Sequence, residues 1–387
     1  MSTTPTSPCF STNHPPSIST SVSSFSDRPP LVLVTGGTGF LAKWVIATLL
    51  RANYRVRTTI RSFARIPELT SALLDAGIPP ALLHPKSGSL DIVTADLSSN
   101  DGWAAALRHV DYVHHIASPF PIHAPRDDYD VIIPAVEGTK RVLKAARDAR
   151  VKRVVLTSSV AAVAYGAAHQ HRDSRSAPFT EENWTDLSRS GIVPAYHRAK
   201  TLAEWAAWVF VERDCVGSGM EMTVVNPVNI YGPVLGRRDE NPTLRVLREL
   251  LDGGAGSGIP KVSVGVVDVR DCVDLLMRAM TDPRARGERF LCVGEGSLWM
   301  ADIARILRRY FGEKARKVPT KVLPDVVVRG MAMFTPVAKM LLPELGAERV
   351  VSARKAREVL GWEWKYTSED AVMAAAESIL RFQTTYD

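Results

Sequence analysis

The sequence predicts an α/β protein with a doubly wound parallel sheet, and three observations lead to this prediction. Residues 31–34 form an uninterrupted apolar run, Leu-Val-Leu-Val, as expected of a short strand buried on both faces. A glycine-rich turn follows at once, and a helical pattern begins directly after it, over residues 41–51. Further apolar strands then alternate with helical segments, which is the order that produces a parallel sheet.

The glycine turn has the spacing Gly36-x-x-Gly39-x-x-Ala42. Gly36 permits a tight turn, Gly39 lets a diphosphate approach the backbone, and Ala42 is small enough for the helix to pack on the strand. The helix start, at Phe40 and Leu41, offers free N–H groups and the positive end of its dipole. The stretch therefore predicts a Rossmann-type dinucleotide site, with an ordinary tight strand-to-helix turn as the alternative.

The composition is typical of some classes of protein and argues against others. The 387 residues are 45% hydrophobic and 23% charged, which is typical of a soluble enzyme with one large α/β domain or two domains. The net charge is +7, but the basic residues are scattered and no nucleic-acid-binding motif accompanies them, so we expect no nucleic-acid partner. The four cysteines are far apart, which favours a reducing, cytoplasmic location without disulfides or a metal site.

No segment of the sequence predicts insertion into a membrane. Residues 1–28 are rich in Ser, Thr and Pro and lack the features of a signal or transit peptide, so we interpret them as a disordered tail. Residues 326–342 form the most apolar later stretch, but Arg329, Pro336 and Lys339 interrupt it. No run reaches the roughly 18 apolar residues of a membrane-spanning helix.

The second predicted strand, residues 54–60, is followed by Arg61. An NAD-selective site usually has an acidic residue at about this place, where it binds both ribose hydroxyls. An arginine can instead pair with a 2′-phosphate and stack on adenine, so Arg61 predicts NADPH as the cofactor. The alternative is a solvent-facing arginine that follows a strand.

The third predicted strand, residues 90–97, ends in Asp96-Leu97. Asp96 is expected to accept a hydrogen bond from the adenine amino group while Leu97 covers the ring. Asp96 would equally suit the cap of a helix that begins near residues 99–103.

The fourth predicted strand starts at Tyr112 and leads into Ala117 and Ser118. Ligands of open α/β sheets lie outside the carboxyl ends of the strands, so we place both residues beside the nicotinamide half of the cofactor. His114 and His115 are adjacent in this strand, so their side chains point to opposite faces of the sheet and do not suit a shared metal ion.

Two later positions carry the chemistry. After a crossover helix over residues 130–149, the strand over 151–159 ends in Ser158-Ser159, and a long helix opens with Tyr196-His-Arg-Ala-Lys200. Tyr196 and Lys200, four residues apart, share one helical face. A neighbouring ammonium makes proton transfer from a phenol easier, and a serine hydroxyl orients a carbonyl oxygen.

In this order, the glycine turn, the Thr-Ser-Ser strand end and Tyr-x-x-x-Lys resemble the extended short-chain dehydrogenase/reductase superfamily over roughly residues 31–383. Several segments resemble its dihydroflavonol reductase and cinnamoyl-CoA reductase branch. These are Val-Thr-Gly-Gly-Thr-Gly-Phe-Leu-Ala at 34–42, His-Ile-Ala-Ser-Pro-Phe-Pro at 115–121, Pro-Ala-Val-Glu-Gly-Thr at 134–139, Val-Leu-Thr-Ser-Ser-Val-Ala-Ala-Val at 155–163 and Asn-Pro-Val-Asn-Ile-Tyr-Gly-Pro at 226–233.

The resemblance implies NADPH-dependent reduction of a ketone or aldehyde. It implies that Tyr196 donates the proton with Ser159, rather than Ser158, and Lys200 assisting. It also implies that Pro227, Asn229 and Ile230 line the nicotinamide pocket.

We expect residues 29–230 to form the NADP-binding domain and residues 231–387 a smaller, mostly helical substrate lobe that interleaves with the end of the sheet. Strands are predicted over 222–226 and 262–269, and helices over 243–251, 301–311, 325–341, 352–360 and 368–382. The apolar side chains of Trp299, Met331, Met333 and Phe334 are candidates for a substrate pocket.

Other functions share parts of this pattern. A nucleotide-sugar epimerase or dehydratase, or a 3β-hydroxysteroid dehydrogenase-like enzyme that oxidises an alcohol, uses the same serine, tyrosine and lysine. A redox sensor that binds NADP would need neither Tyr196 nor Lys200. The sequence predicts a small-molecule carbonyl substrate and a monomer or homodimer, and it leaves the substrate's identity open.

Overall fold

In the computed structural model, the predicted tail lies outside the described part of the chain except for Arg28. The described residues are 28–119, 127–169, 172–189, 193–237, 241–254, 256, 258–335, 338 and 341–383.

A seven-stranded parallel sheet forms the centre of the molecule, with the strand order β3-β2-β1-β4-β5-β6-β9. The order changes direction between β1 and β4, which creates the switch point where ligands of such sheets bind. The strands are β1 (Leu31–Val34), β2 (Arg55–Ile60), β3 (Leu90–Thr94), β4 (Tyr112–His115), β5 (Arg153–Thr157), β6 (Glu221–Pro227) and β9 (Arg289–Cys292).

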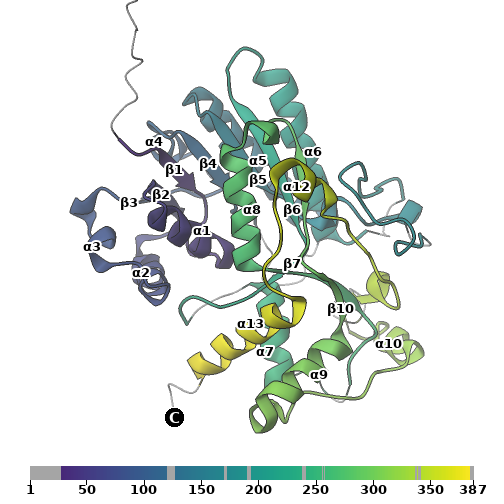
Figure 1. Ribbon diagram of the computed structural model, residues 1–387. Coiled ribbons are helices and arrows are strands. Elements are labelled where there is room, and N and C mark those ends of the chain that lie inside the picture. Colours follow the sequence, from purple (N-terminus) through teal and green to yellow (C-terminus); the bar gives the residue numbers. More distant parts are fainter. Residues whose placement is uncertain are drawn as a thin grey trace, which may run out of the picture.

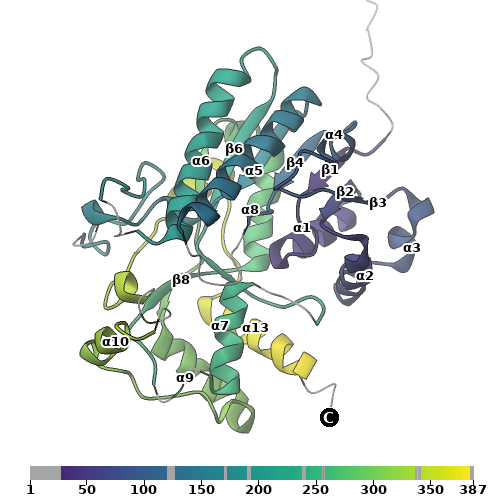
Figure 2. The ribbon, with the colours of Figure 1, turned by 180° about the vertical axis from the view of Figure 1, so that it is seen from behind.

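Helices cover both faces of this sheet. Val32 and Val34 of β1 belong to the core under α1 (Phe40–Arg51) and α8 (Val269–Thr281), which lie in front of the sheet in Figure 1. Leu31 and Leu33 point to the opposite core, shared with α4 (Trp103–Ala106), α5 (Tyr129–Asp148) and α6 (Ala195–Asp214). Figure 2 shows α5 and α6 on this second face. The doubly wound parallel sheet predicted from the apolar β1 run is confirmed.

The C-terminal lobe contains a second, three-stranded sheet with the order β10-β8-β7. Its strand β8 pairs in parallel with β7 and antiparallel with β10. These strands are β7 (Asn229–Tyr231), β8 (Ser263–Asp268) and β10 (Gly296–Trp299). The remaining α-helices described here are α2 (Ile66–Asp75), α3 (Pro80–Leu83), α7 (Pro242–Asp252), α9 (Met300–Phe311), α10 (Asp325–Met331), α12 (Arg354–Leu360) and α13 (Ser368–Gln383).

The helix that follows the glycine turn is attached to the segment that leads into this lobe. The Lys43 side chain is fully buried, and its Nζ donates to the main-chain oxygen of Leu235 at 3.3 Å. The Trp44 indole donates to the oxygen of Pro233 at 2.8 Å. Both contacts fix α1 against a chain segment about 190 residues further on.

Two predicted elements near the sheet are shorter than the sequence suggests. The strand predicted over 90–97 ends at Thr94, because the Asp96 carboxylate accepts from the main-chain N–H of Ser98 and turns the chain. The helix predicted near residues 99–103 is the single turn α4, which begins at Trp103.

In the lobe, the helix predicted over 325–341 ends at Met331. The Met331 carbonyl then accepts from the main-chain N–H groups of Phe334 and Thr335 in a turn. Gly330 weakens the helix locally, and Pro336 in the sequence disfavours helical conformation just before it. Strands β7, β9 and β10 were not predicted; each has only three or four residues.

Within the described residues, we find no helix that is long and apolar enough to cross a membrane.

Candidate active site

The carboxyl ends of the parallel strands bring most of the predicted site residues to one edge of the main sheet. The glycine turn follows β1, Arg61 follows β2, and Asp96 and Leu97 come shortly after β3. Ala117 and Ser118 follow β4, Ser159 follows β5, and Pro227 is the last residue of β6. Asn229 and Ile230 lie in β7, which begins directly after this edge.

Threonine hydroxyls fix the glycine turn. The Thr35 hydroxyl accepts from the main-chain N–H groups of Ile116 and Ala117, at 3.0 and 2.9 Å. Its own proton is therefore available to His115 Nδ1, 3.0 Å away. The Gly36 N–H donates to the Thr59 hydroxyl at 3.0 Å. Gly36 itself has a φ of +72°, the left-handed conformation that glycine adopts without strain.

Gly37 matters for a reason that sequence reasoning did not identify. A Cβ at this position would lie 2.2 Å from Thr58 Oγ1, so only glycine lets the turn lie on β2. Gly39 then caps α1, and neither a capping side chain nor an acidic residue occupies the first turn of that helix. The N–H groups of Gly36, Gly37 and Gly39 donate within the protein and hold the turn in place. The uncapped start of α1 directly after Gly39 is the part that suits a diphosphate.

The predicted adenosine-side residues lie near one another. Arg61 is exposed, and its charge is close enough to Asp96 to help lower the pKa of that carboxyl. The larger causes of the low pKa are hydrogen bonds from the hydroxyl and main-chain N–H of Ser98, at 2.6 and 2.7 Å. Asp96 therefore fixes a local turn with Ser98 and does not cap α4, whose N-cap is Gly102. Leu97 packs partly against the α5 side of the core.

The two strand-end serines differ in their partners. Ser158 is buried, and its hydroxyl donates to the Glu204 carboxylate at 2.5 Å. The Ser159 hydroxyl accepts from the Ala161 N–H at 3.1 Å and hydrogen-bonds with the Tyr196 phenol. Of the two hydroxyls, that of Ser159 is the one beside Tyr196.

Tyr196 and Lys200 lie in the first two turns of α6. Burial raises the pKa of Tyr196, and the hydrogen bond with Ser159 acts in the opposite direction. Burial lowers the pKa of Lys200 to about 8, and the negative charge of Glu204 opposes that shift. Lys200 Nζ donates to the main-chain oxygen of Thr157 at 3.5 Å. The phenol therefore stays protonated near neutral pH beside a lysine that titrates at mildly alkaline pH.

His115 lies near Lys200. It is buried, and burial together with the nearby Lys200 charge lowers its pKa to about 3. It is therefore a neutral ring that accepts from Thr35. His114 is buried on the other side of β4. In the described ranges, no three His, Cys, Asp or Glu side chains gather as metal ligands.

Contacts from the C-terminal lobe reach the helix that carries Tyr196. The rings of Tyr165 and His197 have centroids 4.1 Å apart, and the Arg349 guanidinium lies 4.4 Å from the Tyr165 ring centroid. In contrast, Met333 and Phe334 are 76% and 82% exposed, so they do not line a closed pocket in this structure. Their predicted place in a continuous helix is lost because α10 ends before them.

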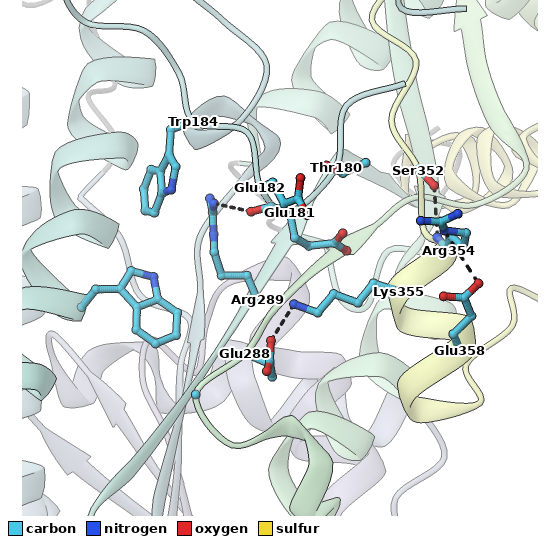
Figure 3. A pocket seen from close by; sticks show the side chains of 12 residues that line it. Thr180, Glu181, Glu182, Trp184, Glu288, Arg289, Ser352, Arg354, Lys355 and Glu358 are labelled. Carbon is cyan, nitrogen blue, oxygen red and sulfur yellow. Dashed lines mark hydrogen bonds and ion pairs between the residues drawn. The ribbon is translucent and has the colours of Figure 1, made fainter. Parts of the chain in front are cut away.

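Sequence reasoning also missed Glu204, which accepts from Ser158, and its other two partners, Asn226 and Arg289. The signal was present for one of them, because Glu204 is four residues after Lys200 and therefore on the same helical face. Arg289 belongs to the unpredicted strand β9. It also lines a pocket of about 530 Å³ beside this edge strand. Glu181, Trp184, Glu288 and Lys355 line the same pocket (Figure 3).

Comparison with known proteins places these features in a family. A family model described as the NAD dependent epimerase/dehydratase family matches residues 32–293. The NADPH-dependent methylglyoxal reductase of Saccharomyces cerevisiae is 30% identical over 91% of this chain and 98% of its own length. Cinnamoyl-CoA reductase 1 of Oryza sativa subsp. japonica is 34% identical over 73% of this chain and 76% of its own length.

Solved structures agree with the sequence relatives. The crystal structure of yeast methylglyoxal/isovaleraldehyde reductase Gre2 complexed with NADPH has a TM-score of 0.74 and 27% identity, covering 92% of this chain and 99% of that chain. The seven-stranded sheet, with a glycine turn at its switch point, defines a Rossmann-type α/β protein. The chain belongs to the NAD dependent epimerase/dehydratase family. The predicted family, fold and oxidoreductase class are thereby confirmed.

Proposed function

We propose that this chain is an NADPH-dependent reductase that converts a ketone or an aldehyde to an alcohol. The observation that carries the proposal is the hydrogen bond between Tyr196 and Ser159 at the carboxyl edge of the sheet, with Lys200 one helical turn further along α6. Relatives named as a methylglyoxal reductase and a cinnamoyl-CoA reductase support it, because both names describe reduction at a carbonyl carbon.

The glycine turn is the proposed diphosphate site, and its fit rests on the glycine-only contacts of Gly36 and Gly37 and on the uncapped start of α1. Arg61 would pair with the 2′-phosphate, which selects NADPH over NADH. NADPH supplies the hydride when bound. The other residues that we assign to this cofactor are Gly39, Phe40, Leu41, Asp96, Leu97, Ala117, Ser118, Pro227, Asn229 and Ile230.

Two side chains would act on the carbonyl group, and a third would support them. Ser159 would donate a hydrogen bond to the carbonyl oxygen and orient it. Tyr196 would deliver its phenolic proton to that oxygen, and its raised pKa keeps this proton in place until transfer. Lys200 would hold the nicotinamide ribose hydroxyls and stabilise the phenolate with its positive charge.

The same family contains epimerases and dehydratases, but a specific feature favours the reductase. The residues directly after Ser159 are Val160–Ala162, a short 3-10 turn without a carboxylate. A dehydratase needs an acid beside the strand-end hydroxyl to assist elimination.

Residues 29–230 would bind the cofactor and residues 231–387 the carbonyl substrate, except that β9 returns to the main sheet.

The test is a substrate panel of methylglyoxal, an aliphatic ketone, cinnamaldehyde, cinnamoyl-CoA and a flavonoid ketone, followed by NADPH absorbance and by mass spectrometry of the product. We expect NADPH consumption with at least one carbonyl compound and an alcohol as the product of a ketone or aldehyde. A UDP-sugar is assayed beside the panel, and its conversion without net consumption of NADPH would instead assign an epimerase or dehydratase.

A further inference from the structure

Glu204 is an unusual residue for the face of α6 that meets the sheet. Its side chain is essentially inaccessible, with 1% of the residue exposed. It follows Tyr196 by eight residues and Lys200 by four, so the three side chains form one row along the helix. A buried carboxylate remains ionised only where cations and hydrogen-bond donors compensate for lost water.

Donors from two strand ends meet at one oxygen of this carboxylate. The Ser158 hydroxyl donates to Glu204 Oε2 at 2.5 Å, and Asn226 Nδ2 donates to the same oxygen at 2.7 Å. Asn226 Nδ2 also lies 3.2 Å from the main-chain oxygen of Ser159, to which it donates. Ser159 is thus held through its own carbonyl and through the side chain of the residue before it.

The other carboxylate oxygen is paired with a cation from the edge of the sheet. Arg289 Nε lies 2.6 Å from Glu204 Oε1, and both side chains are almost completely buried. The Arg289 guanidinium lies 3.8 Å from the centroid of the Trp184 ring and donates to the main-chain oxygens of Glu181 and Asn183. Figure 3 shows Arg289 beside Glu181 at the wall of the pocket. This pairing sets a guanidinium charge directly against the buried carboxylate.

The remaining ionisable groups around Lys200 and Glu204 do not compensate in the same way. His115 of β4 is neutral, and Tyr196 is a protonated phenol. Where α6 meets α5, Arg198 and Asp128 form an ion pair with each other. Among the charges described around Lys200, the Glu204 carboxylate is the one that favours its ammonium form.

We propose that Glu204 is a positioning residue for the reductase site: its buried carboxylate, bonded to Ser158 and Asn226 and paired with Arg289, fixes the strand end that presents Ser159 and keeps a negative charge beside Lys200. This inference rests on the proposed function for its kinetic consequence. Its structural part concerns Lys200 itself and is measurable without substrate.

The experiment compares Glu204→Gln, Glu204→Asp and Ser158→Ala with the wild-type enzyme. The pH dependence of kcat is measured with the panel substrate that is turned over fastest. In parallel, NMR of isotope-labelled lysine in the cofactor-free protein follows the titration of Lys200, with Lys200→Arg for assignment. Glu212→Gln is the matched control, because it removes the same charge from an exposed position of the same helix.

We expect Glu204→Gln to lower the Lys200 titration midpoint and the alkaline limb of kcat together, by about one pH unit. Glu204→Asp and Ser158→Ala keep the charge, so the midpoint stays at its wild-type value while kcat falls at every pH by about tenfold. In Glu204→Gln, a merely structural role would lower kcat without moving the Lys200 midpoint. If Glu204→Gln does not fold, the Asp and Ala variants still decide the question, since a wild-type kcat in both would overturn the positioning role.

An unchanged Lys200 midpoint in folded Glu204→Gln would also overturn the inference. Failure of the proposed function looks different: the wild-type protein would then consume no NADPH with any carbonyl of the panel, while the Lys200 titration would remain measurable.

Discussion

The pH dependence of the reaction is the sharpest consequence of the site's electrostatics. Burial lowers the pKa of Lys200 from an ordinary 10.5 to about 8, with Glu204 acting in the opposite direction. In the proposed mechanism, Lys200 contributes in its charged form, which exists below that pKa. Activity that needs the ammonium is therefore complete at lower pH and is lost as pH rises through about 8.

The size of the effect follows from this value. The charged fraction of Lys200 falls from about nine-tenths near pH 7 to just under one-tenth near pH 9, so kcat should fall about tenfold over that interval. Tyr196 does not add a second transition there, because burial raises the pKa of its phenol. If this lysine were exposed to solvent, the alkaline fall of kcat would begin only above roughly pH 10.

The assay is the initial rate of NADPH consumption at saturating substrate in buffers of constant ionic strength, with enzyme stability checked at each pH. Lys200→Arg is the control, because a guanidinium stays charged throughout and should abolish the limb while lowering kcat. A wild-type kcat that stays constant to about pH 10 would refute the assigned role of the Lys200 ammonium.

Three further substitutions test other parts of the molecule. Arg61→Ala should weaken NADPH binding about 10- to 100-fold in a titration and NADH binding less than about twofold. Arg150→Ala, also at an exposed arginine, is the control. Equal weakening of both cofactors would disprove the 2′-phosphate role. Gly37→Ala should raise the NADPH Kd about tenfold, since its Cβ would lie 2.2 Å from Thr58 Oγ1, whereas Gly330→Ala, with open space around it, should have no effect. A wild-type Kd in Gly37→Ala would show that the turn tolerates a side chain. Trp362→Ala should lower the free energy of unfolding by about 3–5 kcal/mol in urea, because the indole is fully buried and donates to the main-chain oxygen of Asp271. Trp205→Ala, at an exposed tryptophan, should lower it by less than about 0.5 kcal/mol. Equal losses in the two variants would contradict the assigned packing.

The sequence predicted the main sheet well because its signals are local. The buried run over 31–34, the glycine spacing and the Tyr196–Lys200 row each lie within a few consecutive residues, and hydrophobic periodicity or motif order is enough to identify them. The choice between Ser158 and Ser159, in contrast, came from resemblance. The structure adds the physical difference, since the Ser158 hydroxyl is bonded to Glu204 and the Ser159 hydroxyl lies at Tyr196.

What the sequence did not predict depends on contacts between distant residues. Strand β9 has four residues and no distinctive turn signal, and it is stabilised by pairing with β6, more than 60 positions earlier. Arg289 reaches Glu204 only because that pairing exists. Likewise, β10 becomes a strand by pairing with β8 across an intervening helix and strand. Such pairings follow from tertiary structure rather than from local propensity.

The most direct test of a tyrosine-dependent reductase is Tyr196→Phe, measured in two ways. We predict that kcat for carbonyl reduction falls by more than about 100-fold, because the proton donor is gone, while the NADPH Kd stays within about twofold of wild type. Tyr112→Phe is the matched control, since that tyrosine lies at the start of β4, at the opposite end of the strand from the site, and should behave as wild type. A Tyr196→Phe enzyme that keeps its wild-type kcat would contradict the proposed mechanism.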